Sequence, residues 1–83
     1  MLELKDTIEL MNSSDYKDRF KAEYYQTKIR YQKLHNMLIK LEAGKLDFTP
    51  TCSASLLSQQ KRYMGEYLRC LEVRAEIEGI NLD

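Results

Sequence analysis

Helix-breaking residues are scarce in this sequence, which has three glycines and one proline among its 83 residues. Gly44 and Pro50 mark one interruption, Gly79 marks a stop, and long helices are the default between them. The chain is therefore predicted to be all-α and to form a single domain over residues 1–83. The predicted elements are a short N-terminal helix within 1–12 and two long helices over 14–43 and 53–78.

Apolar and aromatic residues recur in both long segments at alternating spacings of three and four, a heptad pattern. Two such helices joined by a short loop predict an antiparallel two-helix hairpin. A lone hairpin has no further layer to cover its apolar surface, so we expect an oligomer. The predicted seam runs through Phe20, Tyr24, Thr27, Tyr31, Leu34, Leu38 and Leu41, and then through Leu57, Gln60, Met64, Tyr67, Leu71 and Arg74.

Charge and cysteine content narrow the class of partner. Thirteen basic and thirteen acidic residues cancel, which argues against nucleic acid as a bulk partner. No run is long enough for a membrane span, and the start MLELKDTIEL has acids where a signal peptide carries bases. Cys52 and Cys70 form no CxxC pair, so neither zinc nor redox chemistry is indicated. We expect a reduced, cytoplasmic protein.

Catalytic motifs are not evident. The single histidine, His35, lies beside the predicted seam, where a lone histidine is usually a solvated helix residue. The sequence contains no Ser/His/Asp set, no glycine-rich phosphate loop and no HExxH motif. We therefore expect a non-enzyme that needs no cofactor and no metal.

The stretch AEYYQTKIRYQKLHNML, within the first long segment, is rich in tyrosines and bases. Helical projection puts Tyr25 well away from the seam, in a stripe with Lys17, Lys21, Lys28 and Gln32. Such a stripe could hold a phosphate while its aromatic ring stacks on a base. It could equally be a solvated basic face with one tyrosine at an oligomer contact, and spacing leaves both interpretations open.

The second long segment, LLSQQKRYMGEYLRCLEVRAEIEGI, follows the pattern L-x-x-Q-x-x-x-M-x-x-Y-x-x-x-L-x-x-R. With its partner SSDYKDRFKAEYYQTKIRYQKLHNML, it resembles the phage and prophage helical hairpins grouped with the anti-CBASS and anti-Thoeris nucleotide sponges. The resemblance covers residues 13–80. It implies an oligomeric phage protein that sequesters cyclic di- or trinucleotides, or cyclic ADP-ribose isomers, in the host cytoplasm without cleaving them.

The resemblance also implies the types of ligand contact. Tyr16 or Tyr25 would stack on a base, Lys17, Lys21 and Lys28 would hold phosphate, and Thr51 and Ser53 in TPTCSAS would supply hydroxyls. Residues 1–12 extend beyond the minimal hairpin, where they either add an oligomer contact or close a pocket. The alternative is a structural or adaptor hairpin that mediates protein–protein interaction and binds no small ligand.

Overall fold

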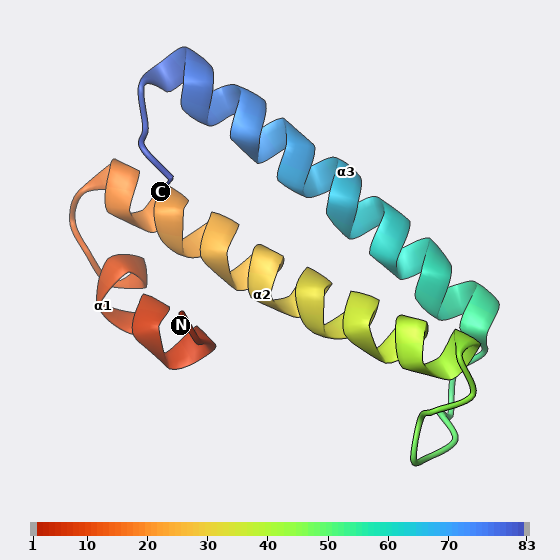
Figure 1. Cartoon of the computed structure of the whole chain (residues 1–83). Helices are drawn as coiled ribbons and strands as arrows, with labels where there is room; N and C mark the ends of the chain where they lie inside the picture. The colour runs from red at the N-terminus through yellow and green to blue at the C-terminus, as the bar shows by residue number, and fades with distance from the viewer. Residues whose placement is uncertain (1, 83) are drawn as a thin grey trace.

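The computed structural model of the chain describes residues 2–82 and contains no strand among them. The prediction of an all-helical protein is confirmed (Figure 1). A 3-10 turn, η1, spans Leu4–Thr7 and leads into α1, which spans Ile8–Met11. Two long helices follow: α2 spans Tyr16–Glu42 and α3 spans Ala54–Glu78.

The ends of the long helices are defined by capping groups. Asp15 caps α2, because its Oδ1 accepts a 3.0 Å hydrogen bond from the Lys17 amide. Ser53 caps α3 in the same way by accepting the Leu56 amide at 3.1 Å. Gly44 and Gly79 follow the helix ends with φ of 72° and 69°, a left-handed conformation that glycine adopts without strain. The helices thus begin one or two residues later than the predicted limits.

Helices α2 and α3 lie side by side (Figure 1). Tyr16 at the start of α2 donates a 2.9 Å hydrogen bond to Glu78 at the end of α3. Further along, Tyr24 donates to Glu72 at 2.7 Å. Residue numbers therefore rise along α2 while those of its contacts on α3 fall.

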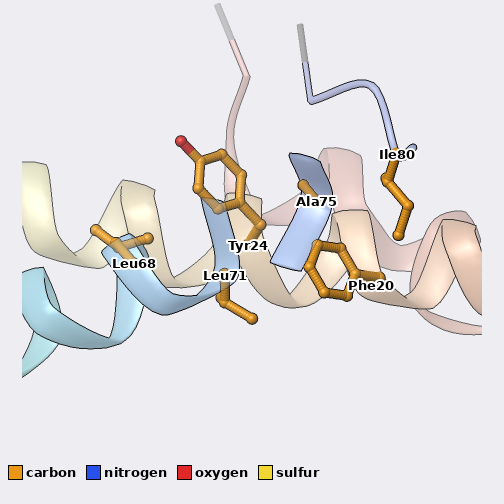
Figure 2. Close-up of a cluster of buried hydrophobic side chains, with 6 residues drawn as sticks. All are labelled: Phe20, Tyr24, Leu68, Leu71, Ala75 and Ile80. Carbon is orange, nitrogen blue, oxygen red and sulfur yellow. The ribbon is translucent and has the colours of Figure 1, made fainter. Parts of the chain in front are cut away.

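The hydrophobic core is small and occupies one half of the helix pair. Phe20 and Tyr24 from α2 meet three residues of α3, and Ile80 packs on the same cluster just after α3 ends (Figure 2). A core of this size leaves much apolar surface exposed, as expected of a short chain. The buried cluster consists of Phe20, Tyr24, Leu68, Leu71, Ala75 and Ile80.

The predicted seam is wrong for half of its α3 positions. Leu71 is buried, but Gln60, Tyr67 and Arg74 are exposed. The surface that faces α2 keeps Leu71 of the predicted seam but is turned around the helix toward Gly65, Leu68 and Ala75. The Tyr31 ring of α2 lies close to the Gly65 backbone, because a Cβ added at Gly65 would be 3.3 Å from that ring.

The N-terminal segment, residues 2–11, packs on α2 rather than on α3 (Figure 1). Thr7 is fully buried there, and its hydroxyl accepts a 2.9 Å hydrogen bond from Gln26. Within the described residues, no helix combines the length and apolar character needed to cross a membrane.

Candidate functional site

A pocket lies between the N-terminal segment and α2. Its volume, about 710 Å³, is in the range of small-molecule sites. Six of its lining residues come from one face of α2, where spacings of three and four align side chains. The lining consists of Leu2, Glu3, Tyr25, Lys28, Ile29, Gln32, Lys33 and Asn36.

The aromatic wall of the pocket is held in place by two contacts. The Tyr25 hydroxyl donates a 2.9 Å hydrogen bond to the Leu82 carbonyl, which ties the C-terminal segment to α2. The Tyr25 ring also meets the buried Tyr24 ring edge-on, with centroids 5.7 Å apart. These two contacts fix the orientation of the ring at the pocket wall.

The charged and polar lining suits an anionic ligand. The lining contains two lysines, Lys28 and Lys33, and one glutamate, Glu3, so basic groups outnumber acidic ones. The Lys28 ammonium is 5.5 Å from the Tyr24 ring centroid, where a cation–π contact orients it. One α2 turn on, the Gln32 amide donates to Asn36 at 3.1 Å, leaving further donors and acceptors for a ligand.

The predicted site residues divide among different parts of the molecule. Tyr25 and Lys28 both line the pocket, together with Gln32 of the predicted stripe. Lys17 and Lys21 lie nearer the start of α2 and are not part of the pocket lining. The two lysines thus remain predicted contacts that lie outside this pocket.

Tyr16 belongs to a polar cluster at the start of α2. Its hydroxyl donates to Glu78 and accepts from Arg74, whose guanidinium also lies 4.9 Å from the Phe20 ring centroid. The Glu78 carboxylate is the main cause of a raised Tyr16 pKa. With its hydroxyl engaged, Tyr16 links the two helix ends, and a stacking role for its exposed ring remains a prediction.

Thr51 and Ser53 lie at the start of α3, at the opposite end of α2 from Tyr16. The 27 residues of α2 span about 40 Å, so one chain does not gather these hydroxyls with Tyr16. Ser53 already accepts the capping hydrogen bond from Leu56. A ligand role for the two hydroxyls stays a prediction.

Sequence reasoning did not assign five of the residues that line the pocket. Ile29, Lys33 and Asn36 continue the Tyr25 face at spacings of four and three, a signal present in the sequence. Leu2 and Glu3 reach the pocket through the packing of the N-terminal segment, which local spacing does not show.

A second, more apolar groove runs along the exposed side of α3. Tyr63 and Tyr67 have exposed fractions of 59% and 41%, although both are large aromatic residues. The Gln59 amide donates to the Tyr63 hydroxyl at 3.2 Å, and this bond, together with nearby Arg62, lowers the Tyr63 pKa. The groove is lined by Leu56, Gln59, Gln60, Tyr63, Met64 and Tyr67.

The fold and the pocket define a class: a small all-helical protein with a pocket lined by an aromatic ring and two lysines. The sequence model of the Sequestin family matches residues 14–77. The chain belongs to this family of phage cyclic nucleotide sponges, which confirms the resemblance to the anti-CBASS and anti-Thoeris proteins. No curated protein and no solved structure gives a significant match to the chain.

Proposed function

We propose that this protein binds a cyclic oligonucleotide or a cyclic ADP-ribose-type signal and sequesters it without cleaving it, acting in the host cytoplasm as a phage immune-evasion protein. The observation that carries the proposal is the pocket beside α2. The pocket is lined by the ring of Tyr25 and by two lysines, Lys28 and Lys33. An aromatic face can stack on a base while ammonium groups neutralise phosphate.

The family match supports the proposal independently of the pocket. It covers residues 14–77, which include all of the α2 residues that line the pocket. The remaining pocket residues, Leu2 and Glu3, lie outside the matched range. Residues 14–77, which the family model matches, thus support a sequestering function. Leu2 and Glu3 can affect which ligand the pocket prefers.

The proposed assembly is a homo-oligomer of antiparallel hairpins built by the single domain 1–83. The cross-helix pairs Tyr16–Glu78 and Tyr24–Glu72 support the hairpin direction. The exposed groove of α3 supports self-association, because Gln60, Met64 and Tyr67 of the family-like pattern line it rather than the core. A second copy of this chain would cover that apolar surface.

A thermal-shift panel of cyclic dinucleotides, cyclic trinucleotides and cyclic ADP-ribose isomers tests the proposal on the intact chain. At least one member should raise the melting temperature of the wild type, and should be recovered unchanged after heat denaturation. Recovery of a hydrolysed product would contradict sequestration without cleavage.

Calorimetric titration then locates the site. Lys28→Ala should weaken binding of the best ligand by roughly tenfold to a hundredfold, the loss expected for one charged hydrogen bond. Lys17→Ala is the matched control, because Lys17 belongs to the predicted stripe but not to the pocket. Equal loss in both variants would favour the whole stripe over the pocket.

The second candidate function is a structural or adaptor role without a small ligand. The exposed aromatic groove of α3 favours it, since Tyr63 and Tyr67 could dock another helix. If no panel member shifts the melting temperature of the wild type, this second function replaces the first.

A further inference from the structure

The chain turns back toward α2 directly after α3 ends. Gly79 has a left-handed φ of 69°, a conformation that glycine adopts without strain. The amide of the next residue, Ile80, donates a 2.9 Å hydrogen bond to the Ala75 carbonyl, and the Ile80 side chain is buried in the core. Residues 79–82, here called the return segment, are therefore anchored on the core, and they lie outside the family-matched range of 14–77.

The return segment is joined to the pocket by one side chain of α2. The Leu82 carbonyl accepts a 2.9 Å hydrogen bond from the Tyr25 hydroxyl, and both side chains pack on the buried core cluster. Tyr25 lines the pocket, whereas none of the described residues of the return segment does. Leu82 therefore acts on the pocket through Tyr25.

The orientation of the Tyr25 ring matters for binding. A side chain that must become ordered when the ligand binds lowers the affinity. Because Tyr25 donates its hydroxyl proton to Leu82, its ring is ordered beforehand, and its one O–H donor is already used. Tyr25 would thus offer a ligand its ring face rather than its hydroxyl.

We propose that Leu82 is a positioning residue of the pocket, whose backbone carbonyl holds the Tyr25 ring in the orientation that stacks on a ligand base. This inference rests on the proposed function, since it concerns the same pocket. It goes beyond that function because it assigns a role to a segment outside the family-matched range. Coupling between two sites is reciprocal, so a bound ligand should in turn hold the return segment in place.

Calorimetric titration of the full chain with cyclic di-AMP, cyclic di-GMP and cyclic ADP-ribose measures the effect on affinity. Tyr25→Phe keeps the ring and removes the donor. The affinity for each ligand that the wild type binds should fall by about twofold to tenfold, the loss expected for one neutral hydrogen bond. Tyr31→Phe is the matched control and should bind like the wild type, because Tyr31 lies on α2 but outside the pocket lining.

A second variant, Gly79→Val, redirects the return segment and leaves Tyr25 unchanged. A β-branched residue rarely adopts a φ of 69°, although a Cβ at Gly79 would have no atom within 4 Å. This variant should also lower the affinity by about twofold to tenfold. Gly44→Val is its control, because it places the same strain, at a φ of 72°, at the far end of α2 and should leave the affinity unchanged.

The double variant shows whether Leu82 acts through the Tyr25 hydroxyl. If it does, Gly79→Val should cause no further loss of affinity in a Tyr25→Phe background, because the hydrogen bond is already absent. A general loosening of the core would instead make the two losses add. Hydrogen exchange followed by mass spectrometry gives an independent readout: bound ligand should slow amide exchange in residues 79–82 of the wild type, and Tyr25→Phe should lose this protection.

The outcomes separate this inference from the proposed function. A wild type that binds at least one ligand, while Tyr25→Phe binds it equally well, overturns the role of Leu82 alone. Additive losses in the double variant do the same. A wild type that binds none of the three ligands, nor any other panel member, overturns both. Circular dichroism checks the helix content of each variant, and Tyr25→Phe decides alone if Gly79→Val loses helix.

Discussion

The Tyr24 hydroxyl donates a 2.7 Å hydrogen bond to the Glu72 carboxylate, which joins the middle of α2 to α3. The same Tyr24 ring contacts Tyr25 edge-on and lies beneath the Lys28 ammonium. One buried residue thus connects the packing of the two helices with the position of two pocket residues.

Tyr24→Phe should lower the free energy of unfolding by about 1 kcal/mol, since it removes this hydrogen bond and leaves the ring in place. Chemical denaturation measures the effect. Tyr67→Phe is the control, because Tyr67 is exposed and has no hydroxyl hydrogen bond among the described residues. A loss as large in Tyr67→Phe would show that the effect does not come from the Tyr24–Glu72 pair.

Leu71→Ala should lower the free energy of unfolding by about 2–5 kcal/mol, because Leu71 is 1% exposed at the centre of the core and truncation leaves a cavity. Val73→Ala, on the same helix with an exposed fraction of 46%, should change it by less than about 0.5 kcal/mol. Thermal melts at matched concentration compare the two variants. Similar losses in both would contradict the core described for α3.

Gln26→Ala should release the N-terminal segment from α2, since Gln26 donates to both Thr7 and Met11. Hydrogen exchange followed by mass spectrometry should show faster amide exchange in residues 4–11, with the α2–α3 core unchanged. Gln60→Ala, in the exposed groove of α3, is the matched amide control. Unchanged exchange in Gln26→Ala would mean that burial of Thr7, not this hydrogen bond, holds the segment.

Two tyrosines should have pKa values that differ from the ordinary tyrosine pKa of about 10. Glu78 raises the pKa of Tyr16, and Gln59 with Arg62 lowers the pKa of Tyr63. Because the folded state holds the Tyr16 proton more tightly, its contribution to stability is complete below about pH 10 and is lost as pH rises through the raised pKa. An ultraviolet titration of tyrosinate should lose a late component in Tyr16→Phe and an early one in Tyr63→Phe. Identical curves for the two variants would contradict these directions.

Tyr67→Glu should dissociate the proposed oligomer while leaving each chain helical, since Tyr67 lies in the exposed groove and not in the core. Light scattering coupled to gel filtration gives the mass, and circular dichroism gives the helix content. Ile77→Glu adds the same charge at an exposed position outside the groove and should leave the mass unchanged. A wild type that is monomeric at micromolar concentration would contradict self-association.

The helices could be predicted because their signals are local: apolar spacing within each segment, a capping serine at Ser53, and glycines at the two helix ends. The face that α3 turns toward α2 could not, because Met64 and Tyr67 have the apolar character of core residues. The side of α3 that packs on α2 depends on which α3 residues fit against the α2 rings. The Tyr31 ring occupies the space that a side chain at position 65 would need, so Gly65 fits opposite it, and these two residues are far apart in the sequence.

The candidate site was predictable where it follows one helix. Tyr25 and Lys28 are three residues apart, which places them on the same face of α2. The opposite wall depends on the hydrogen bond between Gln26 and Thr7, and no periodicity in residues 2–11 indicates such a contact. Lys33 and Asn36 could have been found by following the same face two turns further.

Tyr25 has a practical consequence for anyone who handles this protein. Leu2 lines the pocket with it, and the Leu82 carbonyl accepts a hydrogen bond from its hydroxyl, so the first and last described residues both lie near this part of α2. A purification tag or fluorescent protein fused at either end would sit beside the pocket and compete for space with a ligand. An epitope inserted after Gly44, in the loop at the far end of α2, would leave the pocket open and is the safer place for a label.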